Sequence, residues 1–423
     1  MKNRQRFIAS LIVALVLGTA WAVRGKFGHE QGAAWAGAIG AMAMILVAKR
    51  ADWYHKIFKI ALAAAFGWGL GGMISYGVVV GYGRGVDFVN VYYGLLMLFV
   101  IGILYGFLGG GLFGLALVDS KETRIKWHQL IMEMVAWGIL TYALLINQLE
   151  WLMTPPRSEL WAACLAASIA LAWFIVRKKQ YAVLKVAIWS ALGAGFGFAF
   201  GNFLQVMGSV LKIHFNFWNV MEYTIGFFGG LGMAHGTLTS HWPVSEHKPG
   251  KYSNLLPMIL LLVFIPFVVW DQSFVVDRFR SVLENGGTEY TIFMMQLLAI
   301  GAIFIMAIVV MHNEYIGIKE PWASGTFNCV RTIFIWYLGT YTFLSFLVTG
   351  LFTHPLEQYL YIINIAIVLM MLPRIKESFE AKELSLKISL VAFVLSVLTI
   401  ALLAVVLIVS HPALPGSQVR FAR

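Results

Sequence analysis

Residues 91–118 read VYYGLLMLFVIGILYGFLGGGLFGLALV, and no residue in this stretch carries a charge. A helix of about 20 apolar residues crosses the ~30 Å hydrocarbon core of a bilayer, so the stretch is long enough to do so. The whole chain shares this character, because 60% of its 423 residues are hydrophobic and only 12% are charged. In a soluble domain about a quarter of the residues are charged. We therefore expect an all-α fold, that of a polytopic integral membrane protein.

Apolar runs recur along the chain and predict about 13 transmembrane helices of membrane-spanning length. We place them at approximately residues 7–23, 31–48, 60–81, 91–118, 128–147, 160–176, 184–208, 217–238, 255–271, 290–311, 332–352, 356–373 and 388–410. The connections that remain are too short for a soluble domain of useful size.

Lysine and arginine are unevenly shared between the two sets of connections. With a cytoplasmic N-terminus, 22 of the 31 lie in cytoplasmic segments and 9 on the opposite side. The positive-inside rule then predicts an inner-membrane protein with its N-terminus in the cytoplasm and its C-terminus outside. The basic head at residues 1–6 imitates a cleavable signal, but we expect the first run to be retained as an anchor. Because the net charge of +11 resides in short loops, we expect no nucleic-acid partner.

Glycine marks the predicted helix contacts. Most of the 41 glycines lie within apolar runs, and small residues let helix backbones approach closely in lipid. Residues 106–110 (GFLGG) resemble residues 226–230 (GFFGG), residues 67–71 (GWGLG) resemble residues 195–199 (GFGFA), and a weaker copy stands at residues 37–41 (GAIGA).

This pattern predicts glycine-rich helical-hairpin repeats in runs one and two, three and four, and seven and eight. They would be parallel repeats, as in some transporters. The alternative is chance recurrence of a packing motif. We assign residues 1–250 to this hairpin-repeat half, which carries the candidate site, and residues 251–423 to an aliphatic half that serves as scaffold or oligomer contact.

The connection between the first two runs holds the densest group of polar side chains, namely Arg24, Lys26, His29 and Glu30. Glycines in the same segment permit a tight, re-entrant path, which requires that the backbone be buried in protein or line water. Backbone N–H groups at the start of the second helix add to the positive charge, so the segment suits an anionic group. The alternative is an interfacial loop whose cations snorkel toward lipid headgroups.

Glu222 lies inside an apolar run, where charge is rare and usually functional. Asn202 and Gln205, one turn apart near the outer end of run seven, are candidates to face it across the hairpin. Arg84 is a second glycine-flanked arginine on the side of Arg24. If the repeat is real, we expect the two arginines to approach one cavity.

The sequence lacks the motifs of several well-known classes of enzyme. There is no Walker loop, serine-hydrolase elbow or zinc-peptidase motif, and we expect no cofactor. His235, His241 and His247 are spaced six apart and share no helix face, so we predict no metal site. Cys164 and Cys329 alone form neither a disulfide framework nor a zinc site.

Two functions fit these features. The first is a secondary transporter or uniporter for a small polar or anionic solute, bound by the arginines and lysine, with Glu30 or Glu222 carrying a coupling proton. The second is an intramembrane transferase near the outer face, with His29 as general base and Glu30 orienting it or acting as acid. Membrane lipid and a second copy of the chain are the other expected partners. A receptor, a structural subunit or a partner-dependent channel is the remaining alternative.

Overall fold

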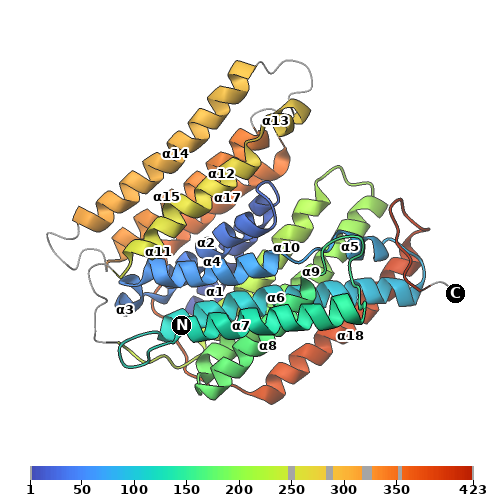
Figure 1. Ribbon diagram of the computed structural model, residues 1–423, viewed down its shortest axis with the longest axis horizontal. Helices are drawn as coiled ribbons and strands as arrows, with labels where there is room; N and C mark the ends of the chain where they lie inside the picture. The colour runs from blue at the N-terminus through green and yellow to red at the C-terminus, as the bar shows by residue number, and fades with distance from the viewer. Residues whose placement is uncertain (1, 246–252, 283–288, 317–325, 351–354, 422–423) are drawn as a thin grey trace.

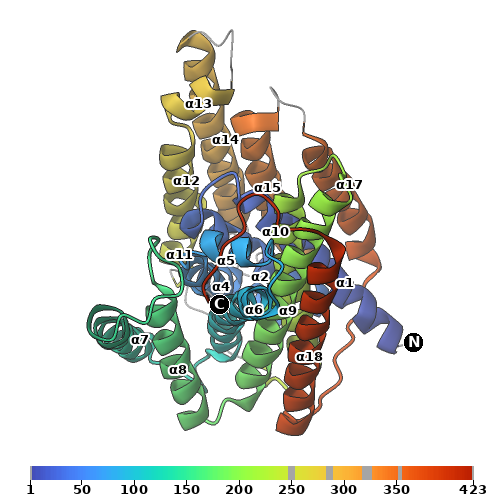
Figure 2. The same ribbon diagram turned by 90° about the vertical axis from the view of Figure 1, so that its right-hand side faces the viewer.

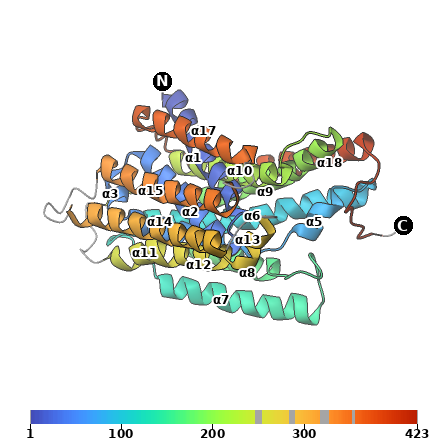
Figure 3. The ribbon, with the colours of Figure 1, turned by 90° about the horizontal axis from the view of Figure 1, so that it is seen from above.

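The computed structural model describes residues 2–245, 253–282, 289–316, 326–350 and 355–421, and within these ranges every regular element is helical. The boundary assumed between the two halves, at residue 250, and His247 lie outside the described residues. Figure 3 shows the helices running roughly side by side, with α3 (Ala51–Tyr54) toward one end and α5 (Gly77–Tyr82) and the C-terminus at the other. We call the end that carries the connection from Arg24 to Glu30 the Arg24 end and the opposite end the Arg50 end.

Within the described residues, ten helical segments, each made of one to three consecutive elements, are long and apolar enough to cross a membrane. The predicted total of 13 goes beyond this number. Of the other three predicted runs, two correspond to shorter apolar helices, α4 (Ile57–Gly72) and α8 (Trp161–Arg177). The third is α10 (Phe217–Leu238), which carries Glu222 and is not among the ten.

Six helices form a closed ring. They are α1 (Lys2–Arg24), α2 (Glu30–Ala48), α4, α6 (Phe88–Val118), α9 (Tyr181–Val210) and α10. Each packs against the next in this order, and α10 packs against α1. The ring therefore consists of three pairs of helices, α1 with α2, α4 with α6 and α9 with α10. That these pairs are repeats stays a prediction.

Glycine permits the close approach of these helices. A Cβ added at Gly106 of α6 would lie 2.1 Å from the carbonyl oxygen of Ser190 on α9, and one added at Gly226 of α10 would lie 2.4 Å from that of Leu17 on α1. Backbone atoms cannot move aside as a flexible side chain can. At each of these positions any larger residue would force the two backbones apart and lower stability.

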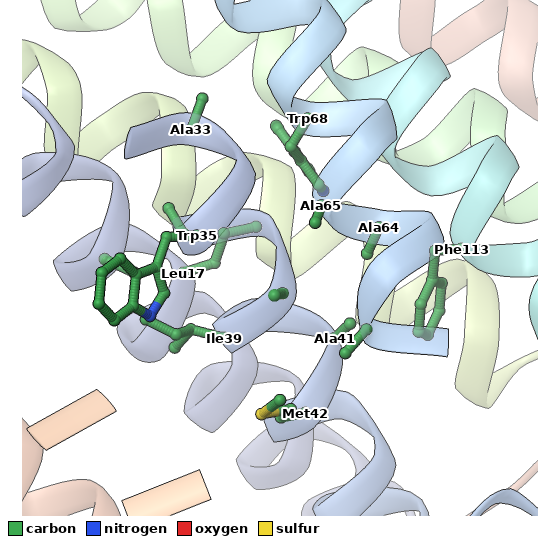
Figure 4. Close-up of a cluster of buried hydrophobic side chains, with 14 of the residues drawn as sticks. Leu17, Ala33, Trp35, Ile39, Ala41, Met42, Ala64, Ala65, Trp68 and Phe113 are labelled. Carbon is green, nitrogen blue, oxygen red and sulfur yellow. The ribbon is translucent and has the colours of Figure 1, made fainter. Parts of the chain in front are cut away.

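Trp68 packs against one glycine from the second helix of each hairpin. A Cβ added at Gly37, Gly109 or Gly229 would lie 2.6, 2.5 and 2.9 Å from the nearest atom of Trp68, which is fully buried. These glycines belong to the three segments that look alike in sequence. Figure 4 shows Trp68 and Ala65 of α4 facing α2.

The third predicted run, residues 60–81, is not one continuous helix. The structure corrects this prediction, because α4 ends at Gly72 and α5 begins at Gly77. Tyr76 lies in the break, and the Tyr105 hydroxyl of α6 donates to the carbonyl oxygen of Ile74 at 3.2 Å. A backbone acceptor freed by the break thus finds a partner inside the protein.

Two buried lysines occupy matching places at the Arg50 end. Lys56, just before α4, donates to the carbonyl oxygens of Leu117 and Asp119 at the end of α6, at 2.6 and 2.9 Å. Lys185, near the start of α9, donates to the carbonyl oxygen of Thr239 at the end of α10, at 2.7 Å. In both hairpins a cation at or near the start of the first helix caps the carboxyl end of the second.

The remaining helices pack around the ring. They are α7 (Trp127–Tyr142) with the π-helical turn η1 (Ala143–Gln148), α8, α11 (Leu255–Ile259), η2 (Leu260–Phe264), α12 (Ile265–Ser273), α13 (Val276–Val282), α14 (Glu289–Ile316), α15 (Phe327–Ser345), η4 (Phe346–Gly350), α17 (Leu356–Met371), the 3-10 turn η5 (Leu372–Arg374) and α18 (Leu386–Ser410). Figures 1 and 2 show α12, α14 and α15 on one side of the ring and α7, α8 and α18 on the other. These helices cover parts of the outer surface of the ring.

Candidate functional site

An ion pair lies inside the Arg24 end of the ring. Arg24 is the last residue of α1, and its Nη2 donates to Glu222 Oε2 of α10 at 2.6 Å. Arg24 is 0% exposed and Glu222 is 6% exposed. Because desolvating two charges is expensive, a buried pair of this kind is weak evidence for stability and stronger evidence for a role in function.

Tyr76 joins the pair from the break between α4 and α5. Its hydroxyl donates to Glu222 Oε1 and accepts a hydrogen bond from Arg24 Nη2 at 3.3 Å. The break therefore delivers a polar side chain that a continuous helix would have placed differently. Both carboxylate oxygens of Glu222 are occupied, one by a guanidinium and one by a phenol.

His29 lies between this pair and the exterior of the Arg24 end. Arg24 Nη1 lies 3.0 Å from His29 Nδ1 and donates to the His29 carbonyl oxygen at 3.5 Å. Nδ1 must accept from the guanidinium, so the ring is neutral with its proton on Nε2. Although much of His29 is exposed, desolvation of its ring and then the charge of Arg24 lower its pKa below the usual value near 6.5.

The turn that holds Arg24 and His29 together depends on glycine. The backbone N–H of Phe27 donates to the carbonyl oxygen of Arg24 at 2.8 Å, and Gly28 follows with φ of +93°, in the left-handed region. Gly32 lets α2 approach, since a Cβ there would lie 2.9 Å from the Arg24 carbonyl oxygen. The tight path expected from these glycines is thus present.

Aromatic side chains close the site toward the Arg50 end. The Arg24 guanidinium carbon lies 4.5 Å from the centre of the Trp21 ring. Trp21 in turn contacts Trp68 and Tyr105, with centroids 5.0 and 5.6 Å apart, and Phe198 of α9 lies 5.0 Å from Tyr76. On the Arg50 side of the ion pair, aromatic side chains from four different helices therefore fill the space that the six helices enclose.

Lys26 and Glu30 lie outside this cluster. Lys26 is half-buried on the other side of the turn, where its backbone carbonyl accepts from Arg278 and the charge of Glu357 acts on its ammonium group. Glu30 is exposed at the start of α2. The structure thus brings together Arg24, His29 and Glu222 of the predicted site.

Arg84 does not approach Arg24. Its Nη1 donates to the carbonyl oxygen of Pro415, and its own carbonyl accepts from the N–H of Leu414, so it holds the C-terminal tail against the end of α5. Arg84 and Arg24 thus bind different partners, and these contacts do not bring them together as expected.

Asn202 and Gln205 contact α5 instead of Glu222. Asn202 Nδ2 donates to the Val80 carbonyl oxygen at 3.4 Å and to Gln205 Oε1 at 3.1 Å. Both amides are buried, and Asn202 Oδ1 and Gln205 Nε2 have no hydrogen-bond partner among the described residues. They form a second polar group one to two turns from Phe198 on the same helix.

Sequence reasoning missed Tyr76. The signal was present in the run Gly71-Gly72 followed by Ser75 and Gly77, which interrupts an otherwise apolar segment. Among the described residues no group of three or more His, Cys, Asp and Glu side chains is arranged to hold a metal ion.

No family model, curated protein or solved structure matches this chain. The functional interpretation therefore depends on the geometry of the site.

Proposed function

We propose that the protein is a multi-pass membrane transporter, a secondary transporter or uniporter, for a small polar or anionic solute that binds at the Arg24–Glu222 pair. The observation that carries this proposal is the burial of that pair within a ring of three helical hairpins. Ionisable residues in such places usually mark substrate or ion pathways.

The surroundings of the pair support transport in two further ways. Interrupted helices and internal repeats are typical of secondary transporters, whose sites lie at the repeat interface. Here the α4–α5 break supplies Tyr76, and the three hairpins present similar glycine segments to Trp68. We propose on this basis that the hairpins are parallel repeats.

The proposed orientation follows from the charge distribution. With the N-terminus in the cytoplasm of a cell with an inner membrane, the Arg24 end faces outward and the aromatic rings separate the site from the cytoplasm. His29 would then be the first residue that an entering solute meets.

The transferase alternative receives less support. His29 and Glu30 are both accessible at the Arg24 end, as a reaction at the outer face would require. However, no hydrogen bond joins Glu30 to His29 among the described residues, and the Nδ1 atom that an orienting carboxylate would hold lies against a guanidinium. A general base needs to accept a proton, and this contact disfavours that step.

Transport can be tested before the solute is known. Purified protein in liposomes would be exposed to a defined mixture of sugars, amino acids, monocarboxylates, dicarboxylates and phosphate, and the vesicle contents measured by mass spectrometry. We expect at least one solute to enter wild-type vesicles faster than empty ones, and Arg24→Ala to abolish this entry.

Arg177→Ala is the matched control, because Arg177 forms an ion pair of similar length with Glu133 on the surface of α7 and α8. It should transport like the wild type. If wild-type vesicles admit none of these solutes faster than empty vesicles while the protein is folded, the proposed function is wrong.

A further inference from the structure

We propose that the solute is a small monocarboxylate and that it enters the site together with one proton, which is taken up by Glu222. This inference rests on the proposed transport function and concerns the same site. Arg24 then forms an ion pair with Glu222 while the site is empty and with the solute while the site is loaded.

The guanidinium of Arg24 has little capacity for a second carboxylate while Glu222 is ionised. Nη2 donates to Glu222 and to Tyr76, and Nη1 is directed at the ring and carbonyl of His29. Only Nε lacks an acceptor among the described residues. A carboxylate that is to bind with the two-pronged geometry that guanidinium favours must therefore take the place of the Glu222 carboxylate.

Charge balance then requires a proton. The closed site holds one positive charge, on Arg24, and one negative charge, on Glu222, so its sum is zero. A monocarboxylate added to ionised Glu222 would leave one uncompensated negative charge out of water, which is strongly unfavourable. One proton on Glu222 restores the sum to zero, because Arg24 then pairs with the solute and Glu222 is neutral.

The other ionisable groups around Glu222 do not alter this balance. The groups that face it are Arg24 from α1, His29 from the following connection, Tyr76 from the α4–α5 break, Tyr105 from α6, Tyr341 from α15 and Tyr361 from α17. The phenols are neutral near pH 7, and His29 is neutral while its Nδ1 accepts from Arg24.

Tyr76 can hold Glu222 in both states. In the ion pair its hydroxyl donates to Oε1, as the structure has it. When Glu222 is protonated, the new O–H donates to the same hydroxyl, which is both a donor and an acceptor. The contact that breaks is between Arg24 and Glu222, the bond that forms is O–H on Glu222, and no electrons are transferred.

The charge count also restricts the solute to a monoanion, and the geometry of the guanidinium favours a carboxylate among monoanions. A dicarboxylate would need two protons, but only one carboxylate in the site is available to accept one. The side chains next to the pair are aromatic, namely Trp21, Tyr105 and Phe198. A short monocarboxylate with a small organic tail fits this combination of one cation and apolar surroundings.

The test uses radiolabelled pyruvate and wild-type protein in liposomes. A gradient that is acidic outside should drive pyruvate accumulation at least tenfold above that at equal pH. A pH-sensitive dye inside should report one proton entering per pyruvate. Clamping the membrane potential with potassium and valinomycin should leave the rate unchanged, because the loaded site is neutral. Excess succinate should not compete.

Glu222→Gln separates binding from coupling, since the amide resembles the protonated carboxyl group but cannot ionise. This variant should exchange internal for external pyruvate yet lose the tenfold accumulation driven by the pH gradient. Glu133→Gln, which removes the carboxylate of the surface pair, should accumulate pyruvate like the wild type.

The outcomes distinguish this inference from the proposed function. If wild-type vesicles admit another solute but neither pyruvate nor any other monocarboxylate of the mixture, or if uptake of pyruvate carries charge or is indifferent to pH, the inference is wrong and transport stands. If Glu222→Gln still accumulates pyruvate along the pH gradient, Glu222 does not carry the proton. Should Glu222→Gln fail to fold, the wild-type proton-to-pyruvate ratio and the succinate competition decide the matter. If no solute enters, the proposed function fails as well.

Discussion

Separating Arg24 from Glu222 should be costly for folding as well as for function. In Glu222→Leu the guanidinium stays at 0% exposure and keeps only neutral partners, the Tyr76 hydroxyl and His29. Leaving an uncompensated charge buried costs about 3–5 kcal/mol. We expect a loss of this size in the free energy of unfolding for Glu222→Leu and for Arg24→Met, and a smaller loss in the double variant than in either single one.

A surface pair in the same protein provides the comparison. The distance from Arg177 to Glu133 is 2.7 Å, against 2.6 Å for the buried pair, but these side chains are 36% and 24% exposed. Exposed pairs contribute about 0–1 kcal/mol. The corresponding variants at Arg177 and Glu133 should therefore each change the free energy of unfolding by no more than this, and the coupling between the two positions should be at most about 1 kcal/mol.

The assay is unfolding by sodium dodecyl sulfate in mixed micelles, followed by circular dichroism for all six variants and the wild type. Equal and additive losses for the buried and the surface pair would refute the reasoning. Such a result would mean that water or relaxation of the ring compensates the charge of Arg24.

Three further predictions concern packing, pH and orientation. Gly106→Ala should lower the free energy of unfolding by about 1–3 kcal/mol, because its Cβ meets a backbone carbonyl of α9. Gly301→Ala is the control: a Cβ there has no atom within 4 Å, so this variant should be neutral or stabilising by up to about 1 kcal/mol. Equal melting temperatures for the two variants would contradict this prediction. Since the pKa of His29 is lowered in the folded protein, the unfolded chain binds more protons below pH ~6.5, so stability should fall on acidification. His29→Gln should flatten that part of the melting curve against pH, and an unchanged slope would exclude His29 as the cause. A cysteine introduced at Ser158 should react only with impermeant thiol reagents added outside the cell, and labelling from the cytoplasm alone would overturn the orientation.

The sequence singles out Arg24 and Glu222 separately but cannot pair them. They are 198 positions apart, and their contact depends on closure of the ring between α1 and α10. Composition and charge rarity identify each residue as unusual for its surroundings. They carry no information about which helices become neighbours.

The break at Tyr76 and the position of Arg84 illustrate two other limits. Hydropathy averages over the polar residues near Tyr76 and joins α4 to α5, although glycine and serine within the run weaken a helix locally. Shared glycine neighbours suggest that Arg84 lies near Arg24, but Arg84 instead donates to the carbonyl oxygen of Pro415, more than 300 residues later. Long-range contacts of exposed segments leave no periodic signal in the sequence.

The ring itself was partly predictable. The matched segments at 106–110 and 226–230 identify helices that pack closely, and glycines from both lie against Trp68. Which hairpin neighbours which follows only from the full set of contacts in the structure.

Transport through the site requires that the ion pair be reached from each end of the ring in turn, and cysteine labelling at Phe198 tests this most directly. Phe198 contacts Tyr76 and Tyr105 within the closed ring. Phe198→Cys would be prepared with the two native cysteines replaced by alanine, and sealed vesicles would be treated with an impermeant thiol reagent on one side at a time. A transporter that alternates between two openings predicts modification from either side. Modification from one side only, at every pH and with every solute tested, would contradict transport and favour a pocket that opens at a single face.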